Sequence, residues 1–280
     1  MHIIDFMLNL AAWILWVNAW MQKHHSRVLQ QPITLLATLK TSRREIREIW
    51  FYLGGCMGVL LIKALLLHYL GSPLNAAVSV DFMHVLVFFQ TGSLVSMGLM
   101  ALTSFLKFAF LAYLWVWFLW NLSREGVAEP IIGNLEMALG FLPGRHVLIQ
   151  VTVLMLLGIG GWIGLGLMFG WVGILPSNVG MSQLIWQAIW ISASAWLSLF
   201  WLILVLMILY LIHSYVYLGN WEGWVWVEGM GERLLEPFEM LPLQWARIDL
   251  SPCIILLMNG IFYLLGSRAP LTKGGGGNVR

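Results

Sequence analysis

Long apolar stretches separated by short polar loops dominate the chain. A helix needs about 20 mostly apolar residues to cross the hydrocarbon core of a membrane. Six stretches approach or reach that length, and we predict that each forms a membrane-spanning helix: residues 3–20, 49–70, 103–120, 147–169, 196–218 and 253–265. The glycine run in residues 267–280 predicts a disordered tail.

Two apolar runs, residues 82–122 and 181–218, are about twice as long as one span requires. We expect each run to contain two elements. The first part, 82–100 or 181–195, is predicted to be a half-helix that lies along or dips into the membrane without crossing it. The second part is the span. The pattern therefore predicts an all-α, polytopic membrane protein with about six spans and two half-helices.

The composition agrees with this class. The chain has 280 residues, of which 60% are hydrophobic and 10% charged, so polar side chains are too few to cover a soluble globule. The net charge of +2 provides no basic field for nucleic acid, and we expect no such partner. Asp5 and the absence of a basic leading segment favour a retained first span over a signal peptide.

Three loops share one signature, in which Gln or Glu precedes a proline and apolar residues follow at spacings of three and four. The prolines are Pro32, Pro130 and Pro237. This spacing predicts a short amphipathic helix on the membrane face in each loop. We therefore predict three span-loop-span repeats, over residues 1–70, 82–169 and 181–266.

The third loop contains the most specific motif: Leu234-Leu235-Glu236-Pro237, then Leu241-Pro242, then Ile248-Asp249-Leu250-Ser251-Pro252. In these residues the chain resembles the YggT family, small integral membrane proteins of bacteria and plastids, with an extra, degenerate repeat at the front. That family usually has an arginine pair after the first proline, where this chain has Phe238-Glu239-Met240. The resemblance implies a non-enzymatic protein of the bacterial inner membrane. The family is linked to assembly of membrane cytochrome complexes, to cell division and nucleoid organisation, and to osmotic tolerance.

Lys and Arg residues concentrate in the three repeat loops, whereas the opposite connections, residues 71–80 and 170–180, contain none. The positive-inside rule therefore predicts cytoplasmic repeat loops and periplasmic termini.

The third-loop motif has two interpretations. Ser251 as N-cap and Pro252 at the first helical position would start a helix, with Asp249 at the positive end of its dipole. Pro237 and Pro242 would restrict the backbone around a short amphipathic helix. Alternatively, the Asp249 carboxylate binds a cation or a partner's arginine.

Two lysines lie in apolar runs, where a charge costs a few kcal/mol, and both are candidate interaction residues. Lys63 lies several residues from the end of its span, which leaves a functional role or pairing with another subunit open. Lys107 lies near the outer edge of its predicted span, from which its ammonium can reach the membrane surface.

Motifs for a catalytic nucleophile, a phosphate-binding loop or a metal centre are missing from the sequence, so we expect no enzyme, no metal and no other cofactor. His68 and His213 are predicted near opposite membrane faces, which opposes haem ligation by the pair.

Two functions stay open. The chain is a scaffold, accessory subunit or assembly factor that packs on other integral membrane subunits, or on itself, through glycine faces at Gly54/Gly58 and Gly160/Gly164. Alternatively, it is a small-solute or ion transporter or channel with a site between the half-helices. A water-filled cavity there would favour transport, and a dry core would favour the scaffold.

Overall fold

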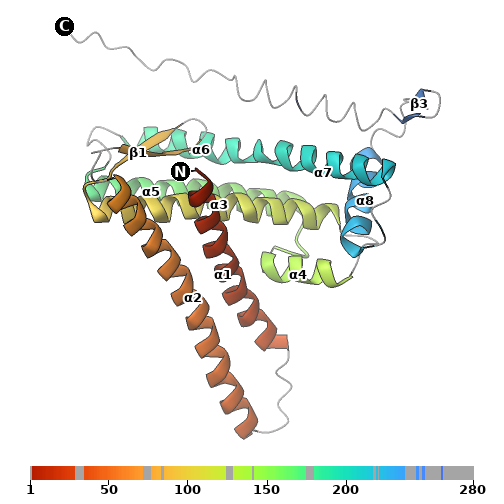
Figure 1. Ribbon diagram of the computed structural model, residues 1–280, viewed down its shortest axis with the longest axis horizontal. Helices are drawn as coiled ribbons and strands as arrows, with labels where there is room; N and C mark the ends of the chain where they lie inside the picture. The colour runs from red at the N-terminus through yellow and green to blue at the C-terminus, as the bar shows by residue number, and fades with distance from the viewer. Residues whose placement is uncertain are drawn as a thin grey trace. The chain divides into compact units, whose positions relative to one another are not determined.

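A computed structural model of the chain describes residues 2–28, 35–71, 77–82, 85–123, 129–140, 142–174, 180–216, 219, 221–236, 244–245, 248–249 and 260. Helices dominate these residues (Figure 1). The helices are α1 (His2–Val28), α2 (Leu35–Gly71), α3 (Leu94–Leu122), α4 (Glu129–Leu139), α5 (Val147–Val172), α6 (Met181–Trp196), α7 (Ser198–Tyr215) and α8 (Glu222–Leu235). The strands are β1 (Ala77–Asp81), β2 (Leu86–Gln90), β3 (Gln244–Trp245) and β4 (Ile248–Asp249).

Five helical segments among the described residues are long and apolar enough to cross a membrane: Ile3–Gln22, Arg47–Leu70, Leu94–Leu122, Val147–Val172 and Met181–Ser214. The predicted polytopic helical class is therefore confirmed. The sixth predicted span, residues 253–265, and the tail, 267–280, lie outside the described residues except for Gly260, which is helical.

The half-helix predicted over residues 82–100 is wrong. Strands β1 and β2 pair as an antiparallel hairpin, and α3 begins only at Leu94. Alternate residues of β2 point inward, with Val87 and Phe89 buried while Leu86 and Phe88 are exposed. A period of two matches a strand with one buried face and does not match a helix.

The start of α3 is set by a local signal, Ser93. The side chain of Ser93 accepts a hydrogen bond from the Ser96 backbone N–H at 3.4 Å, and its carbonyl accepts one from the Met97 N–H at 3.1 Å. Ser93 therefore acts as the N-cap of a helix that begins nine residues before the predicted span at Thr103.

The second predicted half-element, residues 181–195, is helical. It forms α6, which is separated from α7 by a single turn residue, Leu197. Around that turn the Leu197 N–H bonds to the Ser194 carbonyl, which lies three residues back rather than the usual four of an α-helix. Because the break is one residue long, α6 and α7 form one candidate span of 34 residues by length and hydropathy. The helix over residues 181–195 is therefore confirmed, but its predicted separation from a span that begins at residue 196 is not.

Of the three short helices predicted in the repeat loops, the second is confirmed as α4, which begins at Glu129. The prolines of the other two loops, Pro32 and Pro237, lie outside the described residues. The division into three repeats stays a prediction. By contacts the chain forms two compact units: unit 1 contains residues 1–113 and 136–191, and unit 2 contains residues 114–135 and 192–280.

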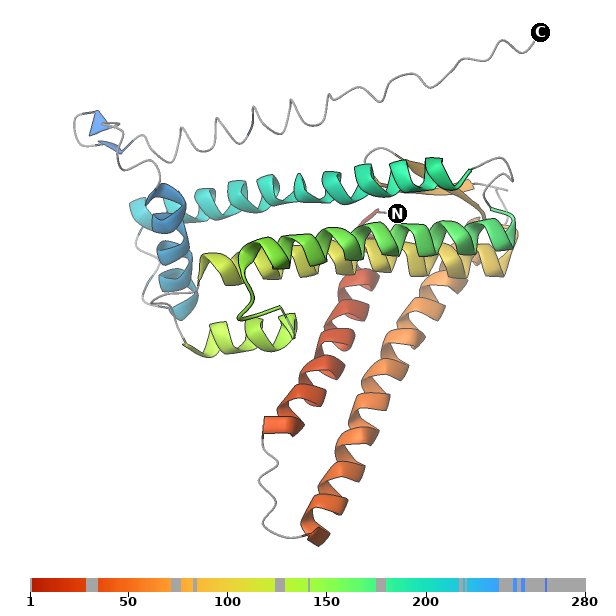
Figure 2. The ribbon, with the colours of Figure 1, turned by 180° about the vertical axis from the view of Figure 1, so that it is seen from behind.

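The main core of unit 1 lies where the β-hairpin packs on α3, α5 and α6. Phe82 contacts Trp162 edge-to-face with ring centroids 4.8 Å apart, and Phe89 contacts Phe169 in the same way at 5.6 Å. Both views place the hairpin at the end of α5 and the beginning of α6 (Figures 1 and 2). Because the strands are covered by helices, their inward face can be apolar throughout.

Unit 2 contains the end of α3, together with α7 and α8. Buried Leu202 and Leu206 of α7 pack with Val227 and Met230 of α8. The Arg233 side chain of α8 donates a hydrogen bond to the Leu122 carbonyl at 2.8 Å, which satisfies a carbonyl in the last turn of α3. Helix α8 therefore closes the end of α3 within this unit.

Candidate functional site

A buried lysine forms the centre of a polar cluster between three helices of unit 1. The Nζ of Lys63 lies 2.6 Å from Asp5 Oδ1 and donates hydrogen bonds to Asn9 Oδ1 at 2.7 Å and Ser104 Oγ at 2.9 Å. An ammonium has three N–H groups, and each has an acceptor here. We call Asp5, Asn9, Lys63 and Ser104 the Lys63 cluster.

The side chains of α1 and α3 in this cluster are also hydrogen-bonded to one another. Asp5 and Asn9 are four residues apart on α1 and therefore share one face of the helix. The Asn9 Nδ2 donates to Asp5 Oδ2 at 3.3 Å and to Ser104 Oγ at 2.9 Å. The Ser104 hydroxyl also lies 3.2 Å from Asp5 Oδ2 and can donate its proton there. In this arrangement Ser104 uses its one donor and both acceptor positions.

The cluster is buried except on one side. Lys63, Asn9 and Ser104 are 1%, 3% and 6% exposed, whereas the Asp5 side chain is 33% exposed. Lys63 precedes the end of its span by seven residues, and Ser104 follows the start of α3 by ten. At about 1.5 Å per residue, these positions are about 10 and about 15 Å along the helices from their ends.

Burying the Lys63–Asp5 ion pair between helices has a free-energy cost that other contacts must offset. Removing two ions from water costs several kcal/mol per ion, and their attraction offsets that cost only when hydrogen bonds complete the pair. Asn9 and Ser104 supply those bonds. Ionisable side chains within membrane spans are rare and usually mark a functional site.

Lys107 lies elsewhere than its predicted position near a helix end. Because α3 begins at Leu94, Lys107 is 13 residues into the helix. Its Nζ donates to the main-chain carbonyl of Asp81 and lies 5.5 Å from the centroid of the Phe82 ring. The ammonium therefore has its contacts on the segment Asp81–Phe82, beside the β-hairpin, rather than at the end of the helix.

The predicted motif of the third loop is mostly outside the described residues. This is the case for Pro237, Pro242, Ser251 and Pro252. Asp249 lies in β4, where it pairs with Gln244 of β3 in an antiparallel register. The proposed helix start at Ser251 and the proposed ligand role of Asp249 therefore stay predictions.

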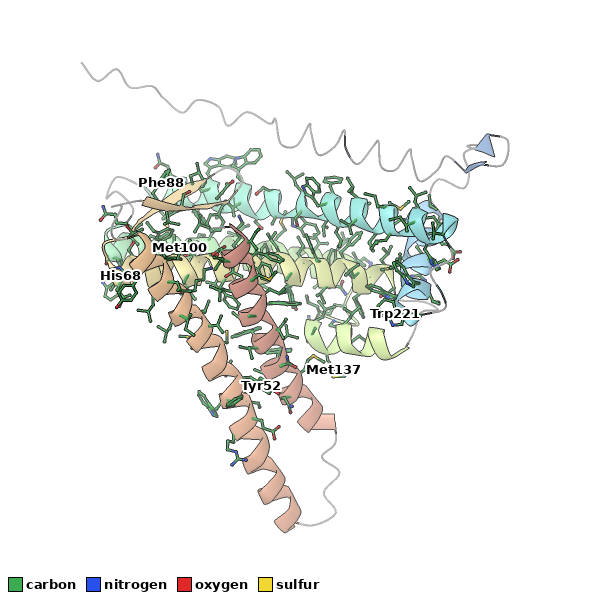
Figure 3. The ribbon with its side chains drawn as sticks, viewed as in Figure 1. Tyr52, His68, Phe88, Met100, Met137 and Trp221 are labelled. Carbon is green, nitrogen blue, oxygen red and sulfur yellow. The ribbon has the colours of Figure 1, made fainter. Side chains whose placement is uncertain are left out.

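The two histidines considered as haem ligands belong to different units, His68 to unit 1 and His213 to unit 2, and each contacts residues of its own unit. The His68 Nδ1, near the end of α2 (Figure 3), lies 2.8 Å from the Thr91 carbonyl. The His213 ring stacks on Trp224 at 5.5 Å, and its Nε2 lies 3.8 Å from Glu228 Oε2.

Sequence reasoning identified Lys63 but missed its partners. Asp5 was noted only as a charge in the first apolar run, and Asn9 and Ser104 were not singled out. A usable signal was present, because Asp5 and Lys63 are opposite charges in two neighbouring apolar runs and Asn9 follows Asp5 by four residues. The described structure satisfies Lys63 within the chain, so its ammonium needs no partner from another subunit.

Comparison of the chain with protein-family models, with curated proteins and with solved structures found no match. The resemblance of the third loop to the YggT family therefore stays a prediction.

Proposed function

We propose that the chain is a non-enzymatic membrane scaffold, an accessory subunit or assembly factor that packs against other integral membrane subunits or copies of itself. One observation carries this proposal. The segments predicted to form a transport site, residues 82–100 and 181–195, contribute Phe89, Met97 and Ala188 to a single apolar core. A transport site between them would need polar groups and water in that space.

Glycine faces on two spans support the choice of other membrane helices as partners. A Cβ added at Gly54, Gly58, Gly160 or Gly164 would meet no atom within 4 Å among the described residues. Small residues let a second helix approach closely, and van der Waals packing of this kind drives helix association in lipid. These faces leave room for a helix from another subunit.

The proposed location is the bacterial inner membrane, with the repeat loops in the cytoplasm and the termini in the periplasm. Charge asymmetry between the loops supports this orientation. The resemblance of the third loop to the YggT family supports an assembly role of the kind linked to that family.

The test is co-purification in mild detergent, followed by mass spectrometry, of the wild type and of variants with blocked glycine faces. Gly54→Leu with Gly58→Leu fills one face, and Gly160→Leu with Gly164→Leu fills the other. Because these positions are open in the described structure, the variants should keep wild-type expression and thermal stability. At least one pair should lose partners that the wild type retains.

Gly55 offers a matched control on the same helix. Its added Cβ would lie 3.4 Å from Leu15 of α1, so Gly55→Leu should lower the unfolding temperature by disturbing packing within the chain. Retention of the same partners by both blocked-face variants would argue against the scaffold proposal.

The Lys63 cluster favours a second candidate, an ion transporter or channel, because ion pathways are one of the features that buried charges in membrane helices mark. This candidate predicts ion flux in liposomes containing the purified protein, and loss of that flux in Asp5→Asn. The scaffold proposal predicts the same ion leak from empty liposomes, from liposomes with the wild type and from liposomes with Asp5→Asn.

A further inference from the structure

Among the described residues, the β-hairpin is a two-stranded sheet and therefore has two outer edges. In an antiparallel pair of strands, opposite residues alternate between hydrogen-bonded pairs and pairs whose backbone groups point outward. The Phe82 N–H donates to the Val85 carbonyl at 2.9 Å, so this pair is of the first kind. Along the observed register, Leu86, Phe88 and Gln90 of β2 belong to pairs of the second kind. Their backbone N–H and C=O groups point away from β1.

The outer edge of β1 is protected by charge. Asp81 stands opposite Leu86, so its carbonyl also points outward, and the Lys107 Nζ donates a hydrogen bond to that carbonyl. The Asp81 carboxylate adds a second charge at the same edge. Charged side chains, lysine above all, are a usual means of preventing an edge strand from pairing with another chain.

The outer edge of β2 has no such protection. Residues 85–91 contain neither a charge nor a proline. Leu86 and Phe88, which is labelled in Figure 3, are 55% and 60% exposed. No hydrogen bond between described residues reaches their outward backbone groups. In water an apolar edge of this kind promotes pairing with another strand, and in lipid an open sheet edge does not occur. In either surrounding, the edge of β2 favours a partner strand.

We propose that the edge of β2 binds the same edge of a second copy of the chain, with the two strands antiparallel about a two-fold axis beside Phe88. In this register Phe88 stands opposite Phe88 of the second copy, and Leu86 stands opposite Gln90. Each of these pairs exchanges both of its hydrogen bonds, so the outward backbone groups of all three residues are used. The two hairpins then form one continuous sheet.

The edge of β2 is complementary to itself. Its outward groups recur at every second residue and are evenly spaced around Phe88, as a two-fold contact requires. Self-pairing sets no like charges opposite one another, because β2 contains no charge. It also places the two exposed Phe88 rings across from each other, and cross-strand aromatic pairs stabilise sheets. This contact rests on the proposed scaffold function, which includes packing on copies of the chain, and adds the surface that those copies use.

The first test is disulfide formation between single cysteines in the full chain in liposomes, after Cys56 and Cys253 are replaced by Ala. Phe88→Cys should give a covalent dimer as the main product. Opposite Cα atoms of a hydrogen-bonded pair lie about 5.5 Å apart, which is within the range of a disulfide. Leu86→Cys is the matched control on the same face. In the proposed dimer its two cysteines lie about 14 Å apart, so this variant should remain a monomer on a non-reducing gel.

The second test uses the cross-strand pair and the direction of one N–H group. Chains with Leu86→Cys and chains with Gln90→Cys, expressed together, should form a mixed disulfide-linked dimer. Adding Phe88→Pro to both chains should abolish it. Because the Phe88 N–H points outward, proline keeps the hydrogen bonds within the hairpin and removes a donor to the second copy. Phe88→Ala, which keeps the N–H, should retain the mixed dimer.

Absence of a Phe88→Cys dimer would overturn the proposal, as would equal disulfide formation by Leu86→Cys. Retention of the mixed dimer in the Phe88→Pro chains would also overturn it. The glycine faces lie on α2 and α5 and are tested by co-purification, so the two experiments are independent. Loss of partners by the blocked glycine faces, without a Phe88→Cys dimer, would reject edge pairing and keep the scaffold proposal. If Phe88→Pro does not express, the comparison of Phe88→Cys with Leu86→Cys still decides the question.

Discussion

Lys63 and Lys107 are the same residue type, both lie in apolar helices, and their surroundings differ. Lys63 is 1% exposed and has three side-chain acceptors, one of them charged. Lys107 is half-buried and donates to one main-chain carbonyl. Residue type and local hydrophobicity could predict that both positions are unusual. They could not predict which lysine is paired, because Asp5 is 58 residues away from Lys63 in the chain.

Lys63→Met should destabilise the protein much more than Lys107→Met. Removing Lys63 leaves the Asp5 carboxylate without its counter-charge, and loss of one partner of a buried pair costs about 3–5 kcal/mol. Removing Lys107 loses one hydrogen bond from an ammonium, about 1.5–3 kcal/mol, and a contact with the Phe82 ring, but leaves no buried carboxylate without its counter-charge. Thermal unfolding in one detergent, read for both variants and the wild type, measures the difference. Equal losses would mean that the Lys63 cluster contributes no special stability.

At the scale of elements, the β-hairpin shows that an apolar run in the sequence can form either a helix or a strand. Residues 82–100 are apolar enough for a helix, yet residues 86–90 form a strand. The alternation that distinguishes the two depends on which side chains are buried, and Phe89 is buried because Phe169 of α5 lies against it. Helix α6, by contrast, was predicted as a helix and is one, because it has no competing period-two pattern.

Phe89→Ala and Phe88→Ala test whether residues 86–90 form a strand with one buried face, because the two residues are adjacent and of the same type. Phe89 is fully buried, so its truncation should cost about 3–5 kcal/mol of unfolding free energy. Phe88 is 60% exposed, and its truncation should change that free energy by less than about 0.5 kcal/mol. Denaturation in detergent followed by circular dichroism gives both values. A helix over the same residues would not produce this alternation, so similar losses would contradict the strand assignment.

At the scale of the whole molecule, charge asymmetry and span length predict how the chain crosses the membrane. The connection that contains the β-hairpin begins in a segment free of Lys and Arg, whereas α4 follows a loop that contains Arg124. Ser79 on the hairpin and Glu136 on α4 are both exposed, and each can carry a cysteine.

Ser79→Cys should react with a membrane-impermeant maleimide added outside intact cells, and Glu136→Cys should react only after the membrane is opened. The positive-inside rule is the physical reason, because basic loops stay in the cytoplasm. Both variants carry replacements of Cys56 and Cys253, and the parent chain without cysteine is the blank. Labelling of Glu136→Cys in intact cells together with protection of Ser79→Cys would reverse the proposed orientation.

By itself, the sequence determined the helical membrane class and the approximate positions of five spans. Both follow from local composition, because about 20 consecutive apolar residues have few stable alternatives to a membrane helix. It also determined that α4 is a helix, through an apolar spacing within eleven residues, and it singled out Lys63 through the cost of a charge in lipid.

The tertiary structure alone decided the pairing of Lys63 with Asp5, Asn9 and Ser104, and the folding of residues 77–90 as a hairpin. Both depend on contacts between segments far apart in the chain. A lysine in an apolar helix needs some counter-charge, but which helix supplies it depends on how α1, α2 and α3 meet. An apolar run adopts the strand when a neighbouring helix covers one of its faces, and α5 does so here.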